Sequence, residues 1–293
     1  MNDYIVHRLS ILFTTILTES DFVDVTIARC DSCGVIFSNP RLTQEEVKTK
    51  YRAIAESEAT YGISQRQPMK KEKRAARIFS LITKTIKRTR SRLSILDYGG
   101  AEGYNLYPFR NEGHSCSVID YETFDYPDGI VHIGKDVQDI PSDQFFDVIL
   151  LCHTLEHVPK PMPLLRNLVH HLSDGGILCV EVPLGCWFEW KRIREPLTHC
   201  LYFSEESLFK CLRKAELDIV SLSTSYQWVT HGKTWCINAV GRKSKNTTPI
   251  SFKTTKQQMG NFRYALQPLM YRPVYYMRRL VTRVARLLRY SSG

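Results

Sequence analysis

The sequence predicts an α/β protein built on a mainly parallel β-sheet with helices on both faces. From residue 93 onward, short apolar and β-branched segments alternate with segments of helical periodicity, as in parallel strands joined by crossover helices. The segment 145–152 is almost uniformly apolar, which is typical of a strand buried on both faces. Two consecutive strands, at 217–226 and 234–243, have no helix between them and predict an antiparallel hairpin on the same sheet.

Local signals place the remaining elements of this part of the chain. A short strand begins at Ser94 and runs into a pair of glycines. The run Asp174-Gly175-Gly176 is expected to close a helix over 160–173, because glycine is common just after a helix. Ser204 is the expected N-cap of a helix over 204–215. The other elements expected are strands at 115–120, 129–134 and 177–183, and a helix at 104–112.

The first 92 residues have a different pattern. Apolar and polar residues alternate within 22–40, which predicts two short strands around a turn containing Cys30 and Cys33. Helices are expected over 43–56 and 69–90, and the second carries an apolar stripe at 3–4 spacing.

Charge is distributed unevenly along the 293 residues. The net charge of +10 divides into +10 for 66–92, +12 for 241–293 and −12 for the remainder. An acidic body therefore carries two basic segments, and the basic face of 66–92 is expected to be solvated. We divide the chain into 1–65, a hairpin and helix; 66–243, the α/β domain; and 244–293, a basic linker and amphipathic helix.

Several classes of protein are excluded by composition. No apolar stretch is long enough for a transmembrane helix, and the N-terminal residues lack the cleavage site of a signal peptide. The nine cysteines are an odd number with one close pair, which favours reduced thiols and a cytoplasmic protein. Two cysteines are half of a four-ligand zinc site, so no metal is expected at Cys30 and Cys33.

A glycine-rich turn follows the first strand of the α/β part, and an acidic residue ends the next strand. The turn runs Asp97-Tyr-Gly-Gly-Ala-Glu-Gly103, where glycines allow a ligand to approach the main chain. Asp120 is placed to accept hydrogen bonds from the ribose of a nucleotide-like cofactor. An acid inside the turn favours a cationic ligand over a pyrophosphate. The alternative is an ordinary tight turn.

Three motifs together resemble the class I S-adenosylmethionine-dependent methyltransferases: ILDYGGAEG, SVIDYE, and FFDVILLCHTLEHVPKPMPLLRNLVHHLSDGGILCVEVP. The resemblance covers roughly 93–243. The flanks ARCDSCGVIFSNPRLTQEEVKTKY and THCLYFSEESLFKCLRKAELDIV are similar to a subgroup associated with sugar and polysaccharide biosynthesis. The resemblance implies a Rossmann-like, seven-stranded sheet whose terminal hairpin is antiparallel, with S-adenosylmethionine at the carboxyl ends of the strands.

The resemblance also implies roles for individual cofactor-binding residues. Asp97 would lie near the amino group of the cofactor, and Asp120 would bind the ribose hydroxyls. Ala101 occupies the usual place of the middle glycine, where alanine is tolerated if its φ is negative. The further cofactor-binding residues are Gly99 and Gly103 at the methionine part, Asp136 or Val137 near adenine, and Cys152 with His153 at the methyl-donor end.

Methyl transfer to a hydroxyl or a carbon acid needs a group that removes a proton, a task suited to His or Glu. A histidine matching His199 is a suspected general base in the sugar-modifying relatives, and His153 and Glu156 are the other catalytic candidates. His157 and Tyr202 lie on the same side. The alternative for Glu156 and His157 is to fix the loop that contains them, and for His199 to position the substrate.

The expected activity is methyl transfer to an oxygen or carbon of a saccharide, nucleotide-sugar or glycolipid precursor. A nucleic-acid methyltransferase is one alternative, but residues 152–155 lack the Asn/Asp-Pro-Pro-aromatic pattern of base amino methylation. A non-catalytic scaffold that binds S-adenosylmethionine and is recruited by its tail is the other. The amphipathic segment 274–290 favours attachment to an anionic membrane surface. Its alternatives are docking on the acidic body and binding RNA or a protein.

Overall fold

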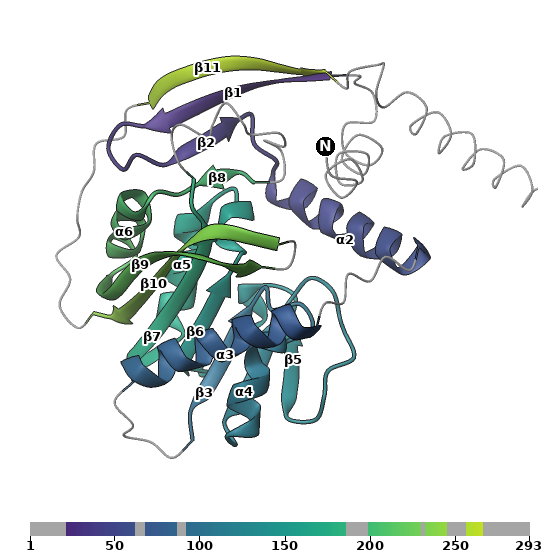
Figure 1. The fold of residues 1–293 in the computed structure, drawn as a ribbon, viewed down its shortest axis with the longest axis vertical. Coiled ribbons are helices and arrows are strands. Elements are labelled where there is room, and N and C mark those ends of the chain that lie inside the picture. The colour runs from purple at the N-terminus through teal and green to yellow at the C-terminus, as the bar shows by residue number, and fades with distance from the viewer. Residues whose placement is uncertain are drawn as a thin grey trace, which may run out of the picture.

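A seven-stranded sheet forms the centre of the molecule (Figure 1). The computed structural model describes residues 22–61, 68–86, 92–185, 199–229, 232–244 and 256–265. The strand order is β5-β4-β3-β6-β7-β10-β9, parallel from β5 to β7, with β10 antiparallel to β7 and β9. The predicted fold class is therefore confirmed. The strands are β3 (Ser94–Tyr98), β4 (Ser115–Ile119), β5 (Ile130–Gly134), β6 (Phe146–Cys152), β7 (Leu172–Pro183), β9 (Leu217–Val229) and β10 (Gly232–Lys243).

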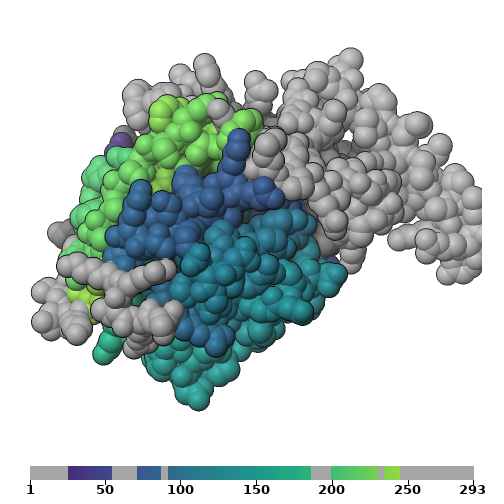
Figure 2. Space-filling view, turned by 60° about the horizontal axis from the view of Figure 1, so that its bottom comes forward, coloured from purple at the N-terminus to yellow at the C-terminus, as the bar shows by residue number. Residues whose placement is uncertain are grey.

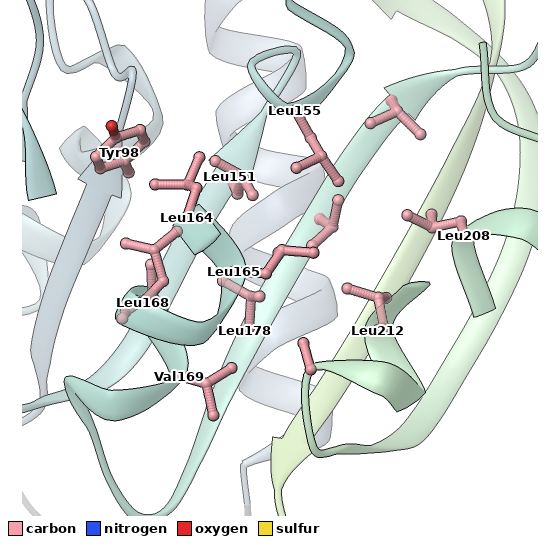
Figure 3. Close-up of a cluster of buried hydrophobic side chains, with 14 of the residues drawn as sticks. Tyr98, Leu151, Leu155, Leu164, Leu165, Leu168, Val169, Leu178, Leu208 and Leu212 are labelled. Carbon is pink, nitrogen blue, oxygen red and sulfur yellow. The ribbon is translucent and has the colours of Figure 1, made fainter. Parts of the chain in front are cut away.

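Helices cover both faces of this sheet. On one face, α3 (Pro68–Thr85) and α4 (Tyr107–Asn111) contribute to an apolar cluster, and α5 (Pro161–His170) and α6 (Glu205–Lys214) contribute to the cluster on the other face. Figure 3 shows leucines of α5 and α6 converging on β6 and β7. The central residues of β6, Val148 to Leu151, are fully buried, which confirms the prediction for that strand. Three short 3-10 helices complete this part: η1 (Tyr104–Leu106), η2 (Val137–Asp139) and η3 (Leu155–His157).

A second, smaller sheet lies above the large one in Figure 1, beside helix α2 (Gln44–Tyr61). Its order is β11-β1-β2-β8, and every pair is antiparallel. The strands are β1 (Phe22–Cys30), β2 (Ile36–Asn39), β8 (Leu201–Tyr202) and β11 (Lys256–Ala265). Ala28, Phe37 and Leu201 belong to the same apolar cluster as α5 and α6. The small sheet and the large sheet therefore share a core.

Several boundaries differ from the sequence prediction. β7 starts at Leu172, so Asp174-Gly175-Gly176 forms an irregularity inside the strand and does not close the preceding helix, which ends at His170. Gly175 has φ +74°, which lets the strand take up the extra residues. The region 104–112 divides into η1 and α4, and Pro108 lies in the first turn of α4, where a missing N–H is tolerated. Strand β11 lies within the segment expected to be a basic linker.

Helix α3 has the predicted apolar stripe, since Ala75, Ile78 and Ile82 are buried. It crosses the face shown in Figure 2 as a dark-blue band between the C-terminal strands and the residues that follow β3. The expectation that its basic face is solvated is wrong for Arg74, whose side chain is 14% exposed, because a buried carboxylate of the sheet pairs with it. The segment 274–290 lies outside the described residues. Among the helices within the described ranges, none has the length and apolarity needed to cross a membrane.

Candidate functional site

The predicted site residues gather where the parallel strands end, and α2 lies over this edge. Gln44 Nε2 donates a 2.7 Å hydrogen bond to the hydroxyl of Tyr121, which follows β4. The ring of Tyr51 meets the ring of His157, which follows β6, edge-on at 5.8 Å. Parallel strands bring their carboxyl ends to one edge, where ligands bind in open α/β sheets. The N-terminal part of the chain therefore covers the edge of the sheet where the parallel strands end.

The glycine-rich turn after β3 has no room for side chains. Gly99 has φ +71°, and a Cβ on it would lie 2.4 Å from Thr154 Oγ1. A Cβ on Gly100 would lie 2.7 Å from the carboxyl carbon of Asp97. Gly103 also has a positive φ of +72°. Glycine is required at Gly99 and Gly100 because Thr154 and Asp97 fill the space that a side chain would need.

Ala101 does not have the negative φ under which alanine is easily tolerated in this turn. Its φ is +46°. Two hydrogen bonds hold this left-handed conformation: its N–H donates to Asp120 Oδ2 at 2.8 Å, and its carbonyl accepts from the Tyr126 hydroxyl at 2.9 Å. These bonds offset the steric cost of a Cβ in the left-handed region, which is about 1 kcal/mol. The turn thus keeps the shape of a glycine turn despite the alanine.

Asp97 is a buried carboxyl with one unsatisfied oxygen. Its side chain is 1% exposed, Oδ2 accepts a 3.0 Å hydrogen bond from Asn105, and Oδ1 has no hydrogen-bond partner among the described residues. Burial raises the pKa of Asp97 to about 6. A cationic donor reaching Oδ1 would satisfy the oxygen and favour the ionised form. This fits the amino group of a bound cofactor.

Asp120 retains capacity to bind a ribose. Its Oδ2 accepts from Ala101 and its Oδ1 from the N–H of Glu122 at 3.2 Å, and each carboxylate oxygen has a second lone pair. Burial raises the pKa of Asp120. The carboxylate therefore has the acceptor positions that the ribose prediction requires, although both its oxygens already serve the turn.

The other predicted cofactor residues have structural partners. Asp136 Oδ1 accepts from Tyr98 Oη at 3.1 Å and from the N–H of Val137 at 2.7 Å, which caps η2. The Val137 side chain is buried. Cys152 belongs to the apolar cluster beneath α3, and burial raises the pKa of its thiol well above the ordinary value. Asp136 thus shapes this edge, and Cys152 is a neutral core residue.

His153 lies between two carboxylates. Its Nε2 is 3.1 Å from Glu181 Oε1, and its Nδ1 is 3.4 Å from Glu156 Oε1. Its backbone has φ +54°, and its N–H donates to the Glu181 carbonyl at 2.7 Å. Burial alone would lower the pKa of His153, but its contacts with Cys236, Glu156 and Glu181 raise it to about 10. The ring is therefore held as a cation that orients both carboxylates.

Glu181 is the centre of an ion-pair network that the sequence did not reveal. It is 1% exposed, pairs with Arg74 Nε at 2.9 Å and contacts Arg77. Burial would raise the pKa of Glu181, but Arg74, His153 and Arg77 hold it well below its ordinary range. Arg77 also donates to Asn238 at 2.8 Å. The network ties α3 to β7 and β10 beside the predicted methyl-donor end.

The third group consists of Glu156, His157 and His199. Glu156 is 2% exposed, and its Oε1 lies 3.8 Å from His157 Nε2. The rings of His157 and His199 meet edge-on at 4.6 Å, and the ring of Tyr202 is 6.1 Å from that of His199. Ligand atoms from all three members of the group lie within 4.8 Å of one another. The structure therefore brings His199 to the residues that follow β6, as its predicted role requires.

A backbone hydrogen bond secures this third group. The N–H of Cys200 donates to the carbonyl of Glu156 at 2.9 Å, which fixes the segment before β8 against η3. The turn containing Cys30 and Cys33, by contrast, belongs to no group of three candidate metal ligands in the part of the chain that the structure describes.

Comparison with known proteins gives one family match and several relatives. A family model described as a methyltransferase domain matches residues 70–222, just over half of the chain. The ubiquinone biosynthesis O-methyltransferase of Rickettsia typhi is 24% identical over 101 residues, which are 31% of this chain and 41% of that protein. Its counterpart from Rickettsia akari is 25% identical over 114 residues, 36% of this chain and 45% of that protein. The matches span less than half the length of these relatives.

A solved structure shares the fold. The 1,6-didemethyltoxoflavin-N1-methyltransferase of Burkholderia thailandensis, crystallised with 1,6-didemethyltoxoflavin and S-adenosylhomocysteine, aligns with a TM-score of 0.56. It is 14% identical, and the alignment covers 74% of this chain and 99% of that chain. None of these three names refers to a saccharide.

Proposed function

We propose that this chain, which belongs to the methyltransferase domain family, methylates an oxygen or carbon of a saccharide, nucleotide-sugar or glycolipid precursor. It is a class I enzyme whose cofactor is S-adenosylmethionine. One observation carries this proposal: the glycine turn after β3 and the Glu156–His157–His199 group after β6 occupy the same edge, because β3 and β6 are neighbouring parallel strands. The flanking motifs at 28–51 and 198–220 support the saccharide class.

On this proposal, Asp97 binds the amino group of the cofactor and Asp120 its ribose hydroxyls. Gly99, Ala101 and Gly103 expose the main chain that the methionine part contacts. The cofactor supplies an electrophilic methyl group on a sulfonium. The unsatisfied Oδ1 of Asp97 supports this placement. Val137 and Asp136 border the adenine position.

The acceptor's proton is removed at the Glu156–His157–His199 group. His153 serves this step as a positioning residue, because carboxylate oxygens face both of its ring nitrogens and neither is left to take a proton. Holding the acceptor against the methyl group in attack geometry supplies much of the rate enhancement, up to about 7–11 kcal/mol.

A phenolic acceptor is the second candidate, favoured by the curated relatives, which are O-methyltransferases of ubiquinone biosynthesis by name. A panel containing nucleotide sugars and a simple catechol distinguishes the two. Methylation of the catechol alone would reject the saccharide class.

The test begins with calorimetry using S-adenosylhomocysteine, and absence of binding at about millimolar ligand would reject the proposal. His199→Ala is then expected to keep that affinity and to lose turnover by at least about 100-fold, the scale of a proton-transfer group. His170→Ala is the matched control, because His170 is exposed at the end of α5. Equal turnover in His199→Ala and the control would remove His199 from the mechanism.

The location of the enzyme is a separate proposal, which rests on sequence alone. The segment 274–290 combines arginines with an apolar face, a pattern that suits the cytoplasmic surface of an anionic membrane. Deletion of 270–293 is expected to abolish sedimentation with anionic vesicles. Unchanged sedimentation would reject the membrane role.

A further inference from the structure

We propose that Glu156, His157 and His199 form a binding site for a divalent transition-metal ion of the zinc or manganese type. Whether the ion binds is independent of the proposed function. What the ion does there, activating the acceptor, rests on that function.

The spacing of the three side chains is close to that of a metal site. A tetrahedral ion with ligand bonds of about 2.1 Å holds its ligand atoms about 3.4 Å apart. Glu156 Oε1 and His157 Nε2 are 3.8 Å apart, and the candidate ligand atoms of the full group lie within 4.8 Å of one another. Small side-chain rotations close this difference.

The carboxylate of Glu156 is buried, and its Oε2 has no partner among the described residues. It is 2% exposed, and neither oxygen has a hydrogen-bond partner among the described residues. The nearby nitrogens of His153, at 3.4 Å, and His157, at 3.8 Å, both approach Oε1. His153 approaches Oε1 and leaves Oε2 without a partner. Burying a polar atom without a partner is costly, and an ion bound by Glu156 would remove this cost.

The surrounding structure holds the three ligands in place before an ion binds. His153 links Glu156 to Glu181. The hydrogen bond from Cys200 N–H to the Glu156 carbonyl brings His199 to the site, and the ring of Tyr51 contacts that of His157. Such outer partners orient metal ligands and raise affinity. Residues of η3 and of the segment before β8 therefore form the site, and α2 packs against it.

The donor set selects the class of metal. Two imidazoles and one carboxylate suit zinc, manganese, iron or cobalt, whereas magnesium and calcium prefer oxygen ligands alone. Three protein ligands leave an open position, as in catalytic metal sites. An ion there would lower the pKa of an acceptor hydroxyl, so that its proton passes to water as the oxygen–methyl bond forms and the sulfur–methyl bond breaks. His199 would then act as a ligand of the ion. It would promote removal of the acceptor's proton by holding the ion and would not accept that proton itself.

The experiment measures metal binding directly on the full chain after treatment with a chelator. Zinc titration followed by calorimetry, with metal content determined by elemental analysis, is expected to give one tight ion per chain. All variants are made in a chain that also carries Cys30→Ser and Cys33→Ser, called the background, because thiolates are themselves zinc ligands and these two free cysteines are close together. Glu156→Gln, His157→Ala and His199→Ala should each weaken zinc binding by at least about 100-fold, beyond the usual effect of an outer partner. His170→Ala should bind zinc as the background does.

Affinity for S-adenosylhomocysteine, measured on the same samples, reports that each variant is folded and is expected to be unchanged. When cobalt is added to the protein from which metal has been removed, its visible absorption spectrum should be that of nitrogen and oxygen ligands, without thiolate bands. The proposal is overturned if the His157 and His199 variants bind zinc as the background does, or if removing Cys30 and Cys33 abolishes the tight ion. Loss of metal binding alone leaves the methyltransferase function standing, whereas absent S-adenosylhomocysteine binding rejects that function and not the metal site.

Discussion

Replacing Asp97 by asparagine is expected to stabilise the protein without cofactor and to weaken cofactor binding. Burial raises the pKa of Asp97 from 3.8 to about 6, so keeping it ionised at pH 8 costs about 3 kcal/mol of folding free energy. Asparagine removes this charge and can still accept from Asn105. The amide nitrogen of the asparagine takes the place of the unsatisfied Oδ1. When this nitrogen has no hydrogen-bond partner, its burial costs about 1–2 kcal/mol of folding free energy. The net gain is therefore about 1–2 kcal/mol at pH 8.

The sign of the pH dependence follows from the raised pKa. The folded state binds the Asp97 proton more tightly than the unfolded state, so the cost of ionisation is absent below about pH 4 and complete above about pH 6. The asparagine variant should gain its advantage across this interval. A charge-assisted hydrogen bond to the cofactor's amino group contributes about 1.5–3 kcal/mol, so the variant should bind about 10- to 150-fold more weakly at pH 8.

Urea unfolding at pH 5 and pH 8 tests the stability change, and calorimetry with S-adenosylhomocysteine over the same range tests affinity. Wild-type affinity is expected to fall as the pH drops below about 6, because Asp97 becomes protonated, and the variant should lack this dependence. Asp143→Asn is the control, since Asp143 is exposed before β6. A variant that binds as tightly as wild type at pH 8, or that is less stable there, would refute the assignment of Asp97 to a cationic ligand.

Two further predictions concern the framework of the site. Glu181→Gln leaves Arg74 and its neighbours without their buried anion and should lower the free energy of unfolding at pH 7 by about 3–5 kcal/mol, measured by chemical denaturation. Because the pKa of Glu181 is lowered, the stabilisation that its charge provides is lost as the pH falls, so the difference between wild type and variant should shrink in acid. A difference that does not change with pH would contradict the ion-pair assignment. Gly99→Ala meets Thr154 Oγ1 and a positive φ and should cost about 1–3 kcal/mol. Adding Thr154→Ala should restore part of that loss, and no restoration would place the strain in the backbone alone.

The large sheet was predictable because its signals are local. The apolar run of β6 and the stripe of α3 each lie within one element and translate directly into burial. The small sheet was only half predictable, because its strands come from opposite ends of the chain. β11 pairs with β1, and β8 pairs with β2, through main-chain hydrogen bonds that carry no periodic signature in the sequence. The irregularity at Gly175 was misread for a related reason, since a glycine turn after a helix and a glycine bulge in a strand have the same composition.

The site shows the same division between local and distant information. The glycine turn and Asp120 were identified because one strand–turn–strand segment contains them. The network around Glu181 was not, because its members lie on α3, on β7 and just after β6. Each looks ordinary alone: two arginines on a basic helix and a glutamate in an apolar strand. Ala101 was misjudged because its φ is set by Asp120 and Tyr126, which contact it from beyond its own turn.

Charge balance at the edge separates structural from functional acids. The acidic side chains buried among the described residues are Asp97, Glu156 and Glu181. Glu181 has Arg74 and His153 as close partners, so its charge is balanced within the fold. Asp97 and Glu156 each retain oxygens without a hydrogen-bond partner. His153 lies 3.4 Å from Glu156 Oε1, but Glu156 Oε2 and Asp97 Oδ1 have no such contact. Since buried polar atoms require partners, these two oxygens mark where cations from outside the chain are expected: an ammonium beside the glycine turn, and a divalent ion beside the acceptor.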